Sequence, residues 1–203
     1  MTNSSSRGWA MPETEFSVRS KIMLVRLVKI RKTAYRKAKK LYQQAFPPEE
    51  QAPFLMLLWK SRKSDVDFWS IYAGNQWAGL LYVVNDGNLS YIFYFAVCPE
   101  FRGRGVGSQA LQEAQSIYQG RKFFLAAEAI DEHAPNYDER VRRKNFYLRN
   151  GFADLHRHVQ EGTVIFELLG IGGDVTAEDY QHLMMNYIGK FIFRNITLRV
   201  LDD

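Results

Sequence analysis

The sequence predicts a mixed α/β fold, and the order of its apolar segments carries that prediction. Three strand-like segments at residues 67–73, 76–84 and 89–97 are joined by turns rich in Gly and Asn, which indicates an antiparallel meander. A helix at 106–117, marked by apolar residues at spacings of three and four, leads into a strand at 122–127. A strand–helix–strand unit of this kind forms a right-handed parallel crossover. The expected sheet is therefore mixed.

Further elements flank this core on both sides. Prolines and glycines mark most of their ends, since proline cannot continue a helix and glycine readily takes the conformation that terminates one. The remaining predicted elements are a strand at 24–30, helices at 34–45, 49–60 and about 139–150, and strands near 152–158 and 163–168.

Composition divides the chain into three segments. Residues 1–21 are rich in Ser, Thr and Asn and are expected to be a flexible leader or a tag, and residues 22–168 are expected to form the main domain. Residues 169–203 form a tail, in which glycines at 170, 172 and 173 indicate a hinge, followed by a helix and a strand-like ending at 191–201. The apolar stripe of the tail helix requires cover, either from the parent domain or from another subunit, so a homodimer through the tail is one expectation.

Composition also limits the partners. With 46% apolar residues the chain can build a sizeable core, and a formal charge of +5 favours anionic partners: nucleic acid, membrane phosphates or a phosphorylated cofactor. Charge alone does not choose among them. Cys98 is the only cysteine, which excludes an internal disulfide. No apolar run is long enough to span a membrane and no signal peptide is recognisable, so we expect a cytoplasmic protein with no membrane partner.

A loop rich in Gly and Arg separates the third meander strand from the next helix. Glycines let backbone amides approach an anion, a helix N-terminus adds partial positive charge, and arginines donate charge-assisted hydrogen bonds to phosphate oxygens. The alternative is an ordinary Gly-rich turn. A dinucleotide-binding fingerprint fails at its last position, and the Walker Gly-Lys-Ser/Thr triplet is absent. The candidate phosphate-binding residues are Arg102, Gly103, Arg104, Gly105, Val106, Gly107 and Ser108.

Two motifs resemble one enzyme family. Residues 102–107 match the Gln/Arg-x-x-Gly-x-Gly/Ala motif of the GNAT (Gcn5-related N-acetyltransferase) family, and residues 146–152 resemble its second conserved segment, which ends in Tyr-x-x-x-Gly-Phe. The resemblance covers about residues 22–168. It implies the GNAT fold: a mixed central sheet with antiparallel N-terminal strands, a βαβ crossover at splayed strands 4 and 5, and helices on both faces.

The same resemblance implies acetyl-CoA as co-substrate. The pyrophosphate would meet the amides of residues 104–108 and the side chains of Arg102 and Arg104, while the backbone of Phe95, Ala96 and Val97 would pair with the pantetheine as an added strand does. The places that usually hold Asn and a small residue in the second segment hold Arg140 and Arg143 here. We expect Asn136, four residues before Arg140, to take over the role of the family's Asn.

Acyl transfer to an amine needs a neutral amine, a site for the oxyanion and a proton for the leaving thiolate. By the resemblance, Tyr147 lies beside the thioester sulfur and is the candidate general acid; the alternative is a packed aromatic side chain. Glu128 ends the apolar strand at 122–127, where ligands of α/β sheets bind, and is the candidate base. Its alternatives are a substrate-orienting or a surface acid.

The leading prediction is an N-acyltransferase that moves an acetyl group from acetyl-CoA to a primary amine of a small molecule or peptide, by direct attack. The rival is a non-catalytic GNAT-fold module that senses an acyl-CoA or contacts nucleic acid; nucleic acid is not the expected partner. No metal is expected, because His156 and His158 lack further ligands nearby. The acceptor and the acyl-chain length stay open.

Overall fold

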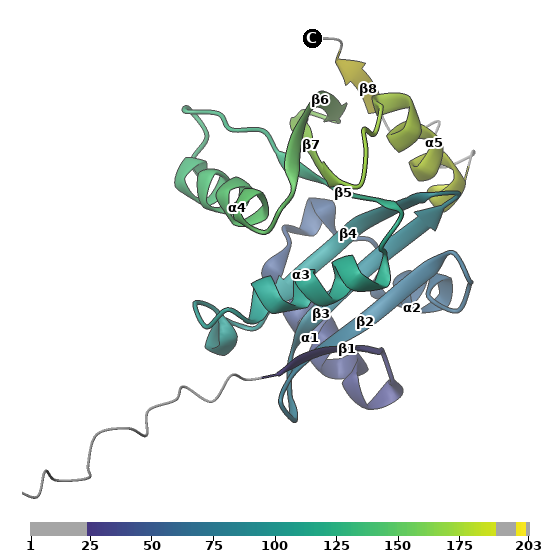
Figure 1. The fold of residues 1–203 in the computed structure, drawn as a ribbon, viewed down its shortest axis with the longest axis vertical. Coiled ribbons are helices and arrows are strands. Elements are labelled where there is room, and N and C mark those ends of the chain that lie inside the picture. Colours follow the sequence, from purple (N-terminus) through teal and green to yellow (C-terminus); the bar gives the residue numbers. More distant parts are fainter. Residues whose placement is uncertain (1–23, 190–197, 202–203) are drawn as a thin grey trace, which may run out of the picture.

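The computed structural model describes residues 24–189 and 198–201, so the predicted leader at 1–21 lies outside it. Within these residues one sheet runs through the molecule in the order β1-β2-β3-β4-β5-β7-β6-β8 (Figure 1). Its strands are β1 (Val25–Lys29), β2 (Val66–Ala73), β3 (Gln76–Asp86), β4 (Leu89–Val97), β5 (Lys122–Glu128), β6 (Ala153–Glu161), β7 (Val164–Ile171) and β8 (Leu198–Leu201).

The sheet has the predicted mixed topology. Strands β1 to β4 pair antiparallel, β4 pairs parallel with β5, and β5 pairs antiparallel with β7. The helices are α1 (Tyr35–Ala45), α2 (Phe54–Lys60), α3 (Val106–Ile117), α4 (Tyr137–Arg149) and α5 (Ala177–Ile188). The meander and the parallel crossover are therefore confirmed.

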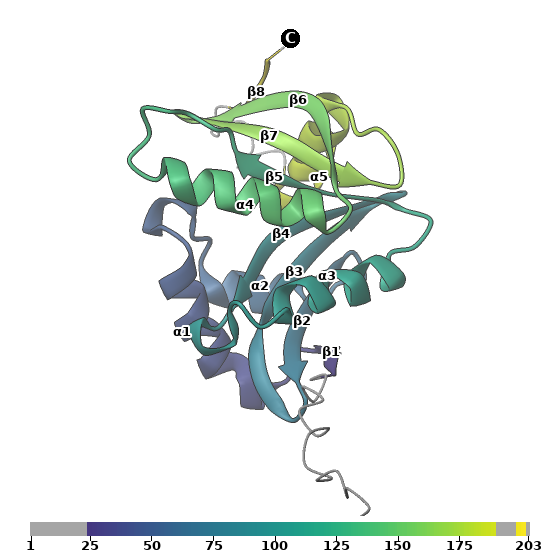
Figure 2. The same ribbon diagram turned by 60° about the vertical axis from the view of Figure 1, so that its left-hand side comes forward.

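Helices cover both faces of the sheet, as Figure 2 shows. Tyr94 and Phe95 are neighbours on β4, and their side chains point to opposite faces of the sheet, as successive side chains of a strand do. The Tyr94 ring lies 4.8 Å from that of Tyr42 on α1, whereas the Phe95 ring stacks at 6.2 Å on Phe146 of α4. We call the first the α1 face and the second the α4 face.

The other helices divide between these two faces. Helix α3 lies on the α4 face, where a Cβ at Gly107 would stand 3.7 Å from Val97 and 3.2 Å from Phe146. Helix α5 lies on the α1 face, where the Tyr187 ring is 5.2 Å from that of Phe93. Phe93 and Tyr94 share this face because Phe93 is an extra residue in the pairing of β4 with β3, which shifts register between Ile92 and Tyr94. The two faces therefore carry different helix pairs along the same strand.

The second predicted helix starts later than the sequence indicates, and the domain boundary at residue 168 stays a prediction. The helix expected at 49–60 is a 3₁₀ turn at Pro48–Glu50 followed by α2, which starts only at Phe54. Pro53 causes the break, because it lacks an amide hydrogen and disfavours helical geometry at Ala52. The predicted domain boundary at residue 168 falls inside β7, which runs to Ile171 and includes Gly170, one of the expected hinge glycines.

The tail helix packs on its own domain. Thr176 begins α5 with the capping box that the sequence indicates, and the apolar side chains of α5 are buried on the α1 face. The Lys60 ammonium donates to the Tyr187 carbonyl, and the hydroxyls of Tyr82 and Tyr187 lie 3.0 Å apart. The parent domain thus supplies the required cover; a homodimer through the tail stays a prediction. Of the strand-like ending, only Leu198–Leu201 is described, as β8 on β6.

Candidate active site

The central feature of the site is the separation of β4 from β5. The two strands pair only over Leu89–Tyr91 and Lys122–Phe124. Beyond Tyr91, β4 continues for six residues to Val97 without a partner on that side, while β5 turns to pair with β7 along its length. The strands therefore splay, and one edge of β4 opens within the sheet.

Backbone groups of β4 point into this opening. The Cys98 amide donates to Ala78 on β3, 2.8 Å away, and the register continues with Gly79 opposite Val97 and Leu80 opposite Ala96. Because hydrogen-bonding directions alternate along an antiparallel pair, the polar groups of Ala96 face β3 and those of Phe95 and Val97 face the opening. Of the three residues predicted to pair with pantetheine, Ala96 therefore has its backbone groups directed elsewhere.

The Gly/Arg loop leads from this edge into α3. Gly103 and Gly105 have φ of 70° and 75°, a region that favours glycine, and Gly105 precedes the helix without a side-chain cap. The first amides of α3 thus meet no side-chain acceptor in the described residues, as an anion site requires. The Arg102 Nε donates to the Val97 carbonyl at 3.0 Å. Arg104 is exposed and joins no hydrogen bond or ion pair with the described residues.

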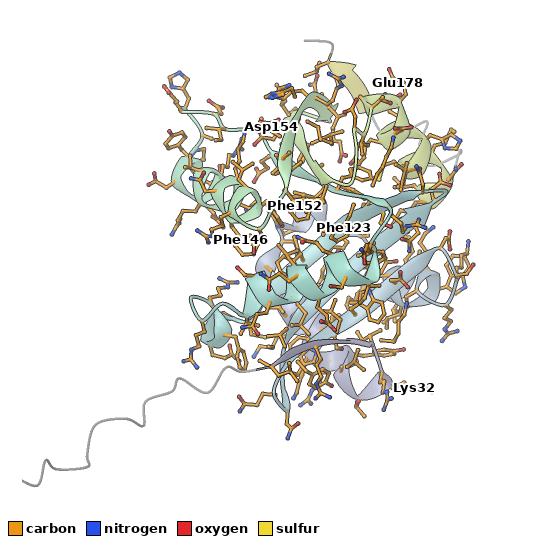
Figure 3. All side chains as sticks on the ribbon, viewed as in Figure 1. Lys32, Phe123, Phe146, Phe152, Asp154 and Glu178 are labelled. Carbon is orange, nitrogen blue, oxygen red and sulfur yellow. The ribbon has the colours of Figure 1, made fainter. Side chains whose placement is uncertain are left out.

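Gly107 has a different role from the other two glycines. A Cβ there would stand 3.2 Å from the Phe146 ring, which α4 directs toward α3 (Figure 3). The glycine thus permits the close approach of α3 and α4. Phe146 closes this contact and stacks on Phe95 beside the open edge.

Tyr147 follows Phe146 on α4 and is buried between Phe146 and Phe152, with ring distances of 5.3 and 5.6 Å. Burial raises the pKa of Tyr147 to about 12, and the positive charge of Arg143 opposes part of this rise. Its hydroxyl makes no hydrogen bond to another described residue. Tyr147 therefore stays protonated at neutral pH and has a donor to offer.

Three comparisons with known proteins bear on this geometry. Residues 64–154, which span β2 to the start of β6, match the family model described as acetyltransferase (GNAT) domain. The chain contains a GNAT domain. The resemblance noted from the two motifs is thereby confirmed. No curated protein matches the chain.

Solved structures show the same fold. A protein described as an acetyltransferase of the GNAT family from Bacteroides thetaiotaomicron superposes with a TM-score of 0.63 at 22% identity, covering 83% of this chain and 98% of that one. A chimera of the Vibrio cholerae spermidine N-acetyltransferase gives 0.58 at 15% identity, covering 73% and 94%. A ribosomal L7/L12 alpha-N-protein acetyltransferase in complex with coenzyme A gives 0.57 at 15%, covering 73% and 93%. The predicted GNAT fold is confirmed.

Glu128, the predicted base, ends β5 of the GNAT domain and is held by two arginines of α4. Its Oε1 lies 3.0 Å from Arg140 Nη2 and its Oε2 lies 2.9 Å from Arg143 Nη1, with 12% of the side chain exposed. Asn136 precedes α4 and joins the same cluster: its amide nitrogen lies 3.4 Å from Glu128 Oε2, and its oxygen accepts from Arg140 Nε at 2.8 Å. The cluster ties the start of α4 to the end of β5.

This cluster explains the two arginines that depart from the family pattern. Arg140 also donates to the Ala129 carbonyl at 2.8 Å, so both guanidinium groups serve contacts within the domain. The predicted roles of Asn136 toward the cofactor and of Glu128 as base stay predictions. The contacts that the structure describes for both residues are with α4.

A second group lies on the α1 face of β4, where the sequence analysis placed no functional residue. The hydroxyls of Tyr91 and Tyr180 lie 3.3 Å apart, and the Tyr180 hydroxyl donates to Oε1 of Glu161 at the end of β6. In the sequence, Glu161-Gly162 has the appearance of turn chemistry only. No local signal indicates that this carboxylate reaches a residue of β4 through α5.

The described residues around the site give little support to a cysteine nucleophile or a metal centre. Cys98 is buried, and burial raises the pKa of its thiol to about 11, so the thiolate form is scarce at neutral pH. Among residues 24–189 and 198–201, no three His, Cys, Asp or Glu side chains gather as metal ligands do. In the same part of the chain, no helix has the length and apolar character needed to cross a membrane.

Proposed function

We propose that the chain is an acetyl-CoA-dependent N-acetyltransferase that acts on primary amines by direct attack. One observation carries this proposal. The open edge of β4 leads through the Gly/Arg loop to the uncapped start of α3 in a GNAT domain, and Tyr147, with an unbonded hydroxyl, follows Phe146, whose ring stacks on Phe95 of that edge. A phosphate site, a strand-pairing site and a proton donor in this arrangement suit a thioester with a long phosphorylated arm.

The cofactor would enter from the α4 face. Its pyrophosphate would bind the amides of residues 104–108, with Arg104 as the charged side chain, and its pantetheine would pair with Phe95 and Val97. Arg102 would play a double part, because its Nε already holds the Val97 carbonyl at 3.0 Å. When a ligand binds, the other guanidinium nitrogens of Arg102 can still face a phosphate.

Tyr147 would act on the sulfur. A hydroxyl with a pKa of about 12 is a weaker acid than an alkyl thiol of about 8.5, so full proton transfer to the thiolate is uphill by roughly three powers of ten. The hydroxyl therefore acts chiefly as a hydrogen-bond donor that stabilises the charge developing on sulfur as the C–S bond breaks. No acyl-enzyme step is needed, and the burial of Cys98 agrees with direct attack.

The acceptor class rests on two arguments. A primary amine is the acceptor that the names of the structural neighbours suggest, since one is a spermidine and one an alpha-N-protein acetyltransferase. The α1 face of β4 also carries the hydroxyls of Tyr91 and Tyr94, and Tyr91 is linked through Tyr180 to the carboxylate of Glu161; such groups suit a cationic ligand. The reaction would take place in the cytoplasm, as the sequence predicts.

Calorimetry with CoA and acetyl-CoA, followed by an assay of thiol release with a panel of primary amines, tests the proposal. We expect CoA to bind, and at least one amine to release thiol at a rate that saturates with acetyl-CoA. If CoA binds but no amine provokes thiol release, the chain is an acyl-CoA sensor and not an enzyme. If CoA does not bind at all, the cofactor assignment is wrong.

A further inference from the structure

The opposite side of the gap carries a carboxylate whose purpose the cofactor site does not explain. Tyr91 is the last residue of β4 that still pairs with β5, opposite Phe124. Its hydroxyl reaches that of Tyr180 on α5, and Tyr180 donates to Oε1 of Glu161. A chain of two hydroxyls therefore links the point where the strands separate to a carboxylate on the α1 face.

Glu161 lies here without a counter-ion. Among the described residues it forms no ion pair, its Oε2 makes no hydrogen bond, and Tyr180 is its single hydrogen-bonding partner. Burial raises the pKa of Glu161, and the bond from Tyr180 opposes part of that rise. A partly buried carboxylate with one neutral donor is costly to keep ionised, and groups held in this condition concentrate at functional sites.

The charge of Glu161 also acts on two tyrosines of β4. Burial raises the pKa of Tyr94, and the negative charges of Glu50 and Glu161 add to that rise, so both carboxylates act on the same hydroxyl. The Tyr94 hydroxyl itself donates to the Glu50 carbonyl at 2.8 Å. Burial and the charge of Glu161 likewise raise the pKa of Tyr91.

Among the side chains that the structure describes near Glu161, none brings a positive charge toward it. On β8, Leu198 stands opposite Glu161 and Arg199 stands opposite Gln160, one position away in the alternation. On α5, Asp179 next to Tyr180 is engaged by Lys122 at 3.5 Å. The turn into β7 contributes Gly162 and Thr163, which carry no charge. Within the described part of the chain, Glu161 thus has no cationic partner, and a positively charged ligand would supply one.

We propose that Glu161 receives the acceptor of the transfer reaction, a protonated primary alkylamine, and takes one proton from its nitrogen. This inference rests on the function proposed above and names the acceptor class and the proton acceptor. The amine would approach from the α1 face, while the thioester lies on the α4 face of the same gap.

The step balances as follows. The ammonium gives one proton to the Glu161 carboxylate, and the neutral nitrogen attacks the thioester carbonyl carbon to form the C–N bond. The C–S bond then breaks with its electron pair on sulfur. The nitrogen loses its second proton, which matches the proton that the thiolate gains, and Glu161 returns its proton to water. One alkylammonium ion and one acetyl-CoA thus give one amide, one thiol and one proton.

Glu161 suits this step better than Glu128. Both oxygens of Glu128 are within 3.0 Å of arginine nitrogens, whereas Oε2 of Glu161 has no partner among the described residues. A proton acceptor needs a lone pair within reach of the substrate.

The test compares wild type with Glu161→Gln and with Glu113→Gln, an exposed residue on α3 whose substitution makes the same change of charge. Thiol release from acetyl-CoA is followed with primary alkylamines at pH 7, and CoA affinity is measured by calorimetry. We expect E161Q to lower kcat/KM by about 10² to 10⁴-fold, the usual range for loss of a general base, with CoA affinity and melting temperature preserved. E113Q should behave as wild type.

Two further readouts separate a chemical role from a structural one. Hydroxylamine is uncharged at pH 7, so E161Q should use it, after subtraction of the uncatalysed reaction, within about threefold of the wild-type rate. Tyr180→Phe leaves the carboxylate but removes the hydrogen bond that opposes the rise in the pKa of Glu161. The pKa of Glu161 should therefore rise further, and the acid limb of the kcat/KM profile should move to higher pH. A structural role predicts neither result.

The outcomes are distinguishable. If wild type turns over an alkylamine and E161Q does so at a comparable rate, Glu161 is not the proton acceptor, although the chain is still an acetyltransferase. Equal losses with hydroxylamine and with alkylamines would also overturn the proposal. If no amine, hydroxylamine included, releases thiol with wild type, the enzyme assignment fails and the role of Glu161 fails with it.

Discussion

Replacement of Lys144 by Met should destabilise the protein strongly, because this ammonium neutralises a nearly inaccessible carboxylate. Lys144 lies on α4, three residues before Tyr147. Its Nζ is 2.8 Å from Asp154 on β6 and 2.5 Å from Glu167 on β7. Only 5% of the Glu167 side chain is exposed, and its Oε1 has no hydrogen-bonding partner among the described residues. The interaction holds the helix that carries Tyr147 to the sheet.

The magnitude follows from what K144M leaves behind. Asp154 is 25% exposed and keeps the His156 amide at 2.9 Å, so water can replace much of its lost contact. Glu167 would be left as a buried, uncompensated charge, which costs about 3 to 5 kcal/mol. We therefore expect K144M to lose about 3 kcal/mol of unfolding free energy at pH 7. The double variant K144M/E167M replaces the pair by apolar side chains and should recover to within about 1 kcal/mol of wild type.

Urea unfolding monitored by tryptophan fluorescence measures the unfolding free energies of K144M and of the double variant.

The same interaction makes stability depend on pH. Burial alone would raise the pKa of Asp154, but the hydrogen bond from Lys144 outweighs burial and the pKa is lowered. The contribution of Asp154 to stability is therefore present above its unfolded pKa and is lost as the pH falls through its folded pKa. The pKa of Lys144 is raised, so its contribution persists below its unfolded value of about 10.4. A loss below 1 kcal/mol for K144M, or strictly additive losses in the double variant, would refute the reasoning.

Two further predictions concern the cofactor site. Arg104→Ala should raise the Kd for CoA by about 5- to 30-fold, the equivalent of about 1 to 2 kcal/mol for an exposed charge-assisted contact, and should leave the affinity for acetyl-pantetheine, which lacks the pyrophosphate, unchanged in calorimetry. An equal loss for both ligands would place Arg104 away from the phosphates. Tyr147→Phe should lower kcat by about 10- to 10³-fold with little change in CoA affinity, because it removes the donor to sulfur alone; an unchanged kcat would leave Tyr147 as a packing residue.

The sequence predicts the strands and the loop that form the cofactor side of the site, because short local patterns of residues determine them. Hairpin turns and apolar alternation place β2 to β4, and the loop from Arg102 to Gly107 is recognisable from glycines and arginines at a strand-to-helix junction. The position of Tyr147 comes from a motif rather than from periodicity. The splay itself was implied only by the family resemblance, since nothing local in β4 or β5 shows that their pairing stops after Tyr91.

The acceptor side could not be predicted, because it depends on contacts between distant segments. Glu161 reaches Tyr91 only through Tyr180 on α5, which docks after the hinge glycines. The pairing of β6 with β7 also shifts register between Asp154 and His158, with a positive φ of 53° at His156. Such a bulge bends a strand and redirects the residues that follow. A basic run at 140–144 indicates a solvated helix face, yet Arg140, Arg143 and Lys144 bind carboxylates of three strands.

The alternation of side chains along β4, shifted once where Phe93 is an extra residue relative to β3, explains how one gap can serve two substrates. Phe95 directs its ring to α4, and its backbone, with that of Val97, faces the opening; Tyr91 and Tyr94 direct their hydroxyls to the α1 face. A thioester paired to this edge would therefore present its carbonyl between two differently built surfaces, one for phosphates and sulfur and one for a cation. Direct attack requires that the gap be open to both. The departure of β5 after Phe124 is what removes the strand that would otherwise close it.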